Sequence, residues 1–140
     1  MFSNACKYGI RAALYLAAHE PGRKSGVKEI ASQLNVPAPF LAKLLQQLAK
    51  EGVISSIKGP GGGFFMSPAN LNGSLSEVIN CIDGLDPLNA CILGLPACSH
   101  KHPCPLHAQA FAYRQGLKFQ LEHQTIKDLA QSVKKEGLHF

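Results

Sequence analysis

Three cysteines gather in one short stretch of the sequence, and their chemistry is the clearest clue in the chain. Cys91, Cys98 and Cys104 are separated by six and five residues, and His107 follows the last of them by three positions. Thiolates are soft ligands that suit iron–sulfur clusters or zinc. We therefore expect thiol or metal chemistry at this stretch before structural disulfides.

Other interpretations of these cysteines stay open at this point. Zinc would use the same ligands, and His100 and His102 enlarge that choice. Two of the thiols could instead form a regulatory disulfide, or all three could be bystanders. The remaining cysteines stand apart: Cys81 follows Val78 by three positions and is expected to pack in a helix core, and Cys6 has no assigned role.

The stretch around the clustered cysteines shows no regular structure of its own. Residues 84–103 carry no hydrophobic period and contain Pro87, Pro96 and Pro103. A structureless loop of about 20 residues is uncommon inside a compact domain. Something other than secondary structure should therefore order it.

The elements before this loop follow a recognisable order. Apolar residues recur at helical spacing over 4–18, 27–34 and 38–50. The period then changes, and short strands over 53–58 and 64–66 flank a glycine-rich turn. Three helices followed by such a hairpin predict a mainly α fold, a winged helix-turn-helix with a small β-hairpin wing.

The second half of the chain supplies further helices. Ser74 and Glu77 form a capping box before a helix over 75–83. A long helix over 105–123 and a last helix over 126–134 follow the cysteine loop. The long helix carries a narrow apolar seam, which favours dimerisation in a coiled-coil manner. Packing on the chain's own domain is the alternative. The seam residues are Leu106, Ala110, Tyr113, Leu117 and Leu121.

The positive charge of the chain lies in its first half. The formal net charge is +5. Residues 1–66 hold eight lysines and arginines against three acidic residues, whereas residues 67–140 hold six of each. A basic half indicates a polyanionic partner. An accidental bias of a solvated surface is the alternative.

Residues 38–50 and the glycine-rich turn are the candidates for contacting double-stranded DNA. The second helix of a helix-turn-helix enters the major groove. Its leucines must face the core, so its lysine and glutamines face outward, where they can read bases or bind phosphate. A merely solvated face is the alternative. In the turn, glycine lets the backbone approach DNA closely. The DNA-binding candidates are Pro39, Phe40, Lys43, Gln46, Gln47, Lys58, Gly59, Pro60 and Gly61.

Several function classes lack support in the sequence. The turn at 58–63 is not a phosphate-binding P-loop, because its lysine precedes the glycines and a strand follows. No Cys-x-x-Cys, nucleotide fingerprint or Ser/His/Asp set is present, so we do not expect an enzyme. Residues 1–18 lack the pattern of a signal peptide, and no apolar run reaches the roughly 18–20 residues of a membrane span. The expected location is the cytoplasm.

Three motifs together resemble the Rrf2 family of transcriptional regulators. They are Tyr8–Ala13 near the start, Phe40–Leu48 in the third helix and Ile57–Phe64 in the wing. The resemblance covers roughly residues 2–130. It implies a homodimer, paired through the helix at 105–123, whose two winged domains read a two-fold symmetric operator.

The resemblance also implies a functional role for each segment of the chain. Residues 1–83 would be the winged helix-turn-helix domain, 84–104 the cluster-binding loop, and 105–140 the dimerisation helix with a C-terminal helix. The expected function is a DNA-binding regulator, acting as a repressor, whose DNA binding an iron–sulfur cluster modulates. A regulator without a cluster, either zinc-stabilised or responding to thiol oxidation or a small ligand, is the alternative.

Cluster-binding members of the family place three cysteines and a histidine or acidic residue in this region. Cys91, Cys98, Cys104 and His107 match that arrangement, although the first gap is one residue longer than usual. Some relatives take a further acidic ligand from the partner subunit, and Lys7 stands at that place here. His107 is therefore the better fourth candidate. The implied cofactor is a 2Fe-2S or 4Fe-4S cluster, whose oxidation, nitrosylation or loss would change the spacing of the DNA-binding helices.

Overall fold

Three helices from the first half of the chain pack around one apolar centre in the computed structural model, which describes all 140 residues. Helix α1 covers Asn4–Ala17, α2 covers Val27–Leu34 and α3 covers Ala38–Lys50. Each helix turns one apolar stripe inward, because its apolar residues recur every three or four positions. The three helices confirm the sequence prediction to within one residue.

A short turn joins α2 to α3. Asn35 ends α2 in the left-handed conformation, with a φ of 56° that asparagine tolerates, and Pro37 begins α3 as its N-cap. Val36 between them is buried. Arg11 of α1 donates to the carbonyl oxygen of Leu34 at 2.7 Å and so holds the end of α2. The arrangement is that of a helix-turn-helix whose second helix is α3.

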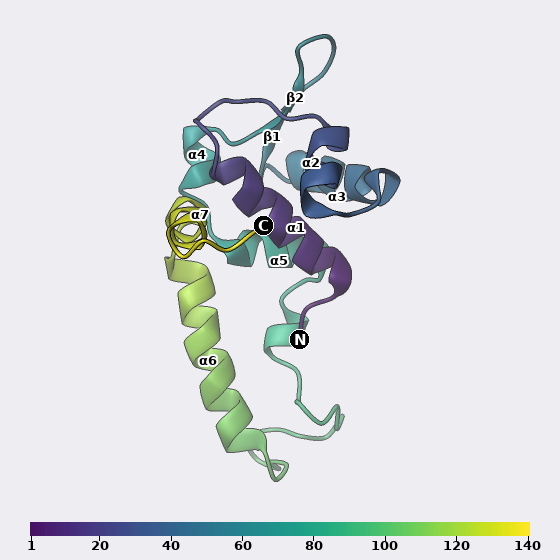
Figure 1. Cartoon of the computed structure of the whole chain (residues 1–140). Helices are drawn as coiled ribbons and strands as arrows, with labels where there is room; N and C mark the ends of the chain where they lie inside the picture. The colour runs from purple at the N-terminus through teal and green to yellow at the C-terminus, as the bar shows by residue number, and fades with distance from the viewer.

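The wing is an antiparallel hairpin. Strands β1, Ser55–Ile57, and β2, Gly63–Phe65, pair with Ser56 opposite Phe64. Ser25, just before α2, exchanges two backbone hydrogen bonds of 2.8 Å with Phe64. The base of the hairpin is therefore fastened to the helical body, while its tip stands free (Figure 1).

Glycine is required where the turn enters β2. Gly63 has a φ of 146°, and a Cβ atom there would lie 2.9 Å from the carbonyl oxygen of Ser25. Only glycine reaches this conformation readily and permits the close approach of the two backbones.

Strand β1 is shorter than the range 53–58 that the sequence predicted, and β2 is shifted by one residue from the predicted range 64–66. Val53, Ile54 and Met66 lie in the core, each less than a tenth exposed, and not in the strand ladder. The apolar residues at the ends of the predicted strands therefore reflect burial beneath the wing and not strand pairing.

Three further segments lead from the wing to the cysteine loop. Helix α4, Pro68–Leu71, begins at a capping box of Ser67 and Asn70 and was not predicted. Helix α5, Leu75–Ile82, begins at the capping box that the sequence predicted. A single 3₁₀ turn then buries Leu88. The remaining loop consists of turns and bends up to α6.

Helix α6, His107–His123, is the longest helix and extends away from the body of the protein (Figure 1). The loop after α5 runs out beside it to reach its N-terminal end. Helix α7, Ile126–Lys135, then turns back against α1 and α4. The N–H of Ile126 donates to the carbonyl oxygen of Gly73 at 2.8 Å, which fastens the start of α7 just before α5.

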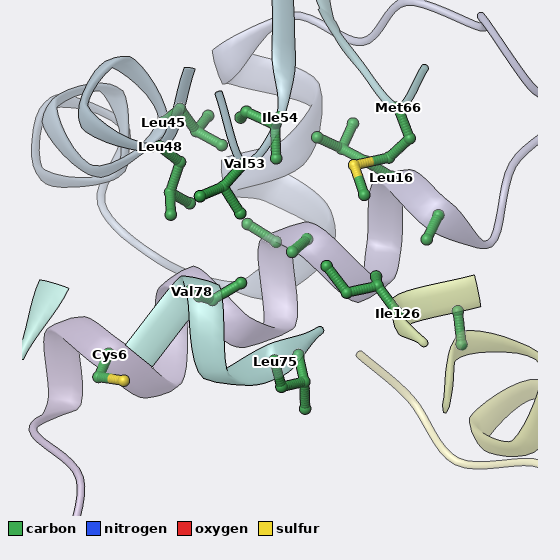
Figure 2. Close-up of a cluster of buried hydrophobic side chains, with 14 of the residues drawn as sticks. Cys6, Leu16, Leu45, Leu48, Val53, Ile54, Met66, Leu75, Val78 and Ile126 are labelled. Carbon is green, nitrogen blue, oxygen red and sulfur yellow. The ribbon is translucent and has the colours of Figure 1, made fainter. Parts of the chain in front are cut away.

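One core of buried side chains joins the two halves of the chain (Figure 2). Leu48 of α3, Val78 of α5 and Ile126 of α7 are all completely buried in it. The last helix thus packs on the same core as the helix-turn-helix. Apart from the tip of the wing, α6 and the cysteine loop project from this common body.

Candidate nucleic-acid interface and metal centre

A groove of about 670 Å³ separates α3 from the wing. Gln46 and Lys50 line it from α3, and Lys58 lines it from the hairpin. The other lining residues are Ala49, Ser56, Ile57, Gly63 and Phe64. The groove therefore offers two ammonium groups and one amide to whatever lies between helix and wing. Lys50 and Ser56 were not predicted, although Lys50 follows Gln46 by one helical turn.

The predicted α3 side chains lie on its exposed side. Lys43, Gln46 and Gln47 all face outward. The Gln47 amide, however, donates to the carbonyl oxygen of Cys81 at 2.7 Å, and so ties α3 to α5. Lys43 and Gln46 have no partner of this kind and remain free to contact a ligand.

The predicted residues at the start of α3 and in the wing also lie at the surface. Pro39 is exposed, and the ring of Phe40 packs edge-on against Tyr8 with 5.8 Å between centroids. At the wing tip, Lys58, Gly59, Pro60 and Gly61 are all exposed. Positive φ angles of 90° and 74° at its two glycines form the turn, a conformation that favours glycine.

The arginines of the basic half are occupied within the protein. Arg11 donates to the backbone carbonyls of Leu34 and Phe140. Arg23 forms an ion pair of 2.9 Å with Glu29. The free positive charge near the groove therefore comes from lysines.

The three clustered cysteines meet at the N-terminal end of α6. Their Sγ atoms all lie within 4.8 Å of one another. The Sγ atoms of Cys91 and Cys104 are 3.8 Å apart, and the N–H of Cys104 donates to the Sγ of Cys98 at 3.4 Å. All three are free thiols. The structure thus brings together residues that the sequence spreads over 14 positions.

His107 opens α6 and reaches the same place. Its Nδ1 lies 3.3 Å from the Sγ of Cys98, and its Nε2 lies 3.2 Å from the Nδ1 of His100. The ring of His100 rests edge-on against Phe111. A hydrogen bond on the second ring nitrogen orients a metal-binding imidazole. His100 therefore supports His107, while His102 lies exposed.

The surroundings shift the pKa values of two of the three thiols in opposite directions. The backbone N–H of Leu95, assisted by that of Leu93, lowers the pKa of the Cys91 thiol to about 7. The N–H of Cys104 also lowers the pKa of Cys98. Burial and the neighbouring thiols outweigh it, so the pKa of the Cys98 thiol is raised. Once one of these closely packed thiols is ionised, its negative charge disfavours ionisation of the next. A bound cation would offset this repulsion between thiolates.

Arg114 is a residue at this site that sequence reasoning missed. It is only 6% exposed on α6, and its guanidinium donates at 2.6 Å to the carbonyl oxygen of Ala90, directly before Cys91. Ala110 and Leu121, at helical spacing on either side, are also buried. That spacing was the available signal, since it places the arginine within the apolar stripe.

The other two cysteines lie outside this cluster. Cys6 is completely buried in α1, where burial, followed by Asp83, raises the pKa of its thiol to about 12. Cys81 packs against the core from α5, and its Sγ lies 3.7 Å from the carbonyl oxygen of Gln47. Neither belongs to the group of thiols whose Sγ atoms lie within 4.8 Å of one another.

Apolar side chains remain uncovered on α6 and the cysteine loop. On the predicted seam, Leu106 and Tyr113 are 46% and 63% exposed, whereas Ala110 and Leu121 are buried. The loop adds three exposed residues, which are Ile92, Leu93 and Leu95. The projecting end of the protein is therefore its most apolar surface.

The relationship of the chain to known proteins follows from its sequence over nearly its whole length. The profile of the Rrf2 family, described as "Iron-dependent Transcriptional regulator", matches residues 2–132. The chain belongs to the Rrf2 family. Its members are transcriptional regulators and not enzymes, which confirms the prediction made from the motifs of α1, α3 and the wing.

Curated relatives of this Rrf2 protein are described as HTH-type transcriptional regulators. It is 32% identical over 131 residues to a putative HTH-type transcriptional regulator of Aquifex aeolicus, covering 92% of this chain and 90% of that one. It is 33% identical over 132 residues to the HTH-type transcriptional regulator NsrR of Halalkalibacterium halodurans, covering 87% and 84%.

Solved structures of other regulators share the fold of this Rrf2 protein. CymR, the global cysteine regulator of B. subtilis, superposes with a TM-score of 0.74 at 22% identity, covering 94% of this chain and 97% of the other. IscR of T. potens superposes with a TM-score of 0.71 at 19% identity, covering 100% and 93%. The predicted mainly α winged fold is thereby confirmed.

Among the helices of the structure, none combines the length and apolar character needed to cross a membrane.

Proposed function

We propose that this Rrf2 protein binds double-stranded DNA as a homodimer and acts as a repressor whose DNA binding an iron–sulfur cluster modulates. The convergence of Cys91, Cys98 and Cys104, with Sγ atoms within 4.8 Å, carries this proposal. In functional terms, residues 1–83 bind DNA, 84–104 hold the cluster and 105–140 dimerise and close the fold.

The donor set fits an iron–sulfur cluster. Three thiols and the Nδ1 of His107 would hold it, and clusters accept both cysteine and histidine ligands. The description of the family as iron-dependent supports a metal of this kind. When bound, a cluster supplies bonds to the loop that oxidants can break.

The groove between α3 and the wing supports the DNA-binding assignment. With α3 in the major groove, Lys43 and Gln46 would face base edges and phosphates, and the wing tip would bring Lys58 to the adjacent backbone. The full proposed interface consists of Pro39, Phe40, Lys43, Gln46, Gln47, Lys50, Ser56, Lys58, Gly59, Pro60 and Gly61.

The uncovered seam of α6 supports the homodimer. Tyr113 and Leu106 leave apolar area in water on a helix that stands away from the body (Figure 1). A second copy of α6 would cover it and set two α3 helices on one side of a two-fold symmetric operator. Sedimentation velocity tests this: Tyr113→Glu should yield monomers, whereas Lys127→Glu on α7 should not. A Tyr113→Glu dimer would contradict the assignment.

Contacts lead from the cysteine site to the groove. Arg114 joins the loop to α6, α6 packs against α5, and α5 is tied to α3 by the Gln47–Cys81 hydrogen bond. Two orientations of α6 would therefore present α3 differently. A ligand at the loop shifts DNA affinity only as far as it stabilises one of these states over the other.

Zinc is the second candidate for the site, and one distance favours it. Two thiolates bound tetrahedrally to one zinc ion at about 2.3 Å lie about 3.8 Å apart. The Sγ atoms of Cys91 and Cys104 are 3.8 Å apart. The protein would then be a zinc-stabilised regulator that responds to thiol oxidation or a small ligand.

Metal analysis of anaerobically purified protein distinguishes the two candidates. We expect a brown protein with iron and acid-labile sulfide, colourless after Cys98→Ala but still brown after Cys81→Ala. A colourless protein holding zinc would overturn the cluster and support the alternative.

DNA binding is tested separately, by selection from a pool of random duplexes. Enrichment of two-fold symmetric sites is expected, and no enrichment would contradict that assignment.

A further inference from the structure

Arg114 is the most deeply buried charge in the chain. Its side chain sits on α6 at 6% exposure, and one guanidinium nitrogen donates to the carbonyl oxygen of Ala90 at 2.6 Å. Its Nε has no hydrogen-bond partner. The one ion pair of the protein joins Arg23 to Glu29, so no carboxylate lies within 4.0 Å of Arg114.

A buried guanidinium in this state requires an explanation. Arginine stays charged at any physiological pH and presents five N–H donors, so removing it from water without an anion is costly. A single backbone carbonyl satisfies one donor and supplies no negative charge. The fold therefore buries a positive charge at a position where a neighbouring anionic group is expected to compensate it.

Two small hollows show where that negative charge would lie. One, of about 350 Å³, is lined by Cys91, Tyr113 and Arg114 among others. The second, of about 280 Å³, is lined by Cys98, His107 and Arg114 among others. Arg114 is the only residue that lines both hollows, and each hollow is also lined by one of the clustered cysteines.

We propose that Arg114 is the positioning residue that compensates the negative charge of the occupied cysteine site and holds the loop around it. This inference rests on the proposed function, because it needs an occupied thiolate site. Three thiolates carry more negative charge than one divalent ion neutralises, so the filled site remains anionic. The same guanidinium binds the carbonyl directly before Cys91, which links the charge to the position of that ligand.

Charge and hydrogen bonding can be separated by substitution. Arg114→Gln keeps a donor for Ala90 but removes the charge, whereas Arg114→Lys keeps the charge and loses the planar donor set. Lys118→Gln removes one positive charge from the same helix, one turn further on, and controls for net charge. Circular dichroism and thermal melting show whether each variant folds.

The test is an anaerobic titration of the metal-free protein with Co²⁺, followed by thiolate-to-cobalt absorbance. We expect Arg114→Gln to weaken Co²⁺ affinity by about 10- to 100-fold, as outer-shell partners of metal ligands do. Arg114→Lys should recover most of the affinity, and Lys118→Gln should match the unaltered protein. In protein reconstituted with a cluster, the midpoint potential of Arg114→Gln should be more negative, because a positive charge favours the reduced state.

The outcomes distinguish the proposed role of Arg114 from the proposed cysteine site. Unaltered Co²⁺ affinity and unaltered potential in a folded Arg114→Gln protein would overturn the role of Arg114 and leave the cysteine site standing. Equal losses in Arg114→Gln and Arg114→Lys, with equally lowered melting temperatures, would reduce Arg114 to a packing role. Absence of any thiolate-to-cobalt band in the unaltered protein would overturn the cysteine site and this inference together.

Discussion

Replacing Lys58 by alanine should change how DNA binding depends on salt. Three free lysines lie on or beside the groove, at positions 43, 50 and 58. In a dimer these make about six phosphate contacts, so log K should fall with log salt at a slope of about −5.4. Affinity would then drop about 1,800-fold between about 50 and 200 mM salt.

Lys58→Ala removes one contact from each domain of the dimer. The slope should fall to about −3.6, and the loss of affinity over the same salt range should shrink to about 150-fold. Fluorescence anisotropy with a selected duplex, repeated at four or five salt concentrations, measures both slopes. Lys127→Ala is the matched control, because it removes an exposed lysine from α7, outside the groove.

The reasoning fails if Lys58→Ala leaves the slope unchanged. The wing would then not lie against the phosphates, even if the protein still binds DNA through α3. A slope reduced equally by Lys127→Ala would show that net charge, and not the groove, governs the salt dependence.

Three further outcomes test the structure itself. Gly63→Ala should destabilise the protein by about 1–3 kcal/mol in urea unfolding, because it forces an alanine into a glycine conformation against the Ser25 carbonyl. Alkylation of Cys91 in the metal-free protein should rise with pH to half its limit near pH 7, where the thiolate forms, while Cys6, with a pKa of about 12, stays unreactive. Ile126→Ala should cost about 2–5 kcal/mol, because a completely buried side chain is removed from the shared core.

Each of these outcomes has a contrary result, and Gly63→Ala has a matched control. Gly59→Ala meets no neighbouring atom, so a loss as large as that of Gly63→Ala would show that contact with Ser25 contributes nothing. A midpoint of Cys91 alkylation near pH 9 would mean that the loop N–H groups do not stabilise its thiolate. If Ile126→Ala unfolds like the unaltered protein, α7 does not belong to the common core.

The helical elements were predictable because their signals are local. Apolar spacing in α1, α2 and α3 and the capping box of α5 depend on residues a few positions apart, and the structure reproduces them closely. Helix α4 escaped prediction because a helix of only four residues has no detectable period. The first strand was predicted too long, and the second one residue too far along the chain, because burial beneath the wing produces the same apolar signal as pairing.

The functional residues, like the helices and strands, were predictable only where their signal is local in the sequence. Cys91, Cys98 and Cys104 were predictable as a group because few other residue types have their chemistry, and the structure brings their Sγ atoms together. Arg114 was not predictable from its type, because a charged residue on a helix usually faces water. The hydrogen bond of Gln47 to Cys81 depends on the packing of α3 against α5, and no local pattern records it.

The length of α6 determines what kind of message can pass along it. A helix of 17 residues spans about 25 Å, and the cysteine site lies at its start while its end reaches the common body. At physiological ionic strength, dissolved ions screen exposed charges over about 8 Å. A gain or loss of charge among the thiols would therefore fade well before it reached the lysines of the groove. Any influence of the cysteine site on the groove therefore has to be mechanical, through a tilt or rotation of α6 as a rigid helix.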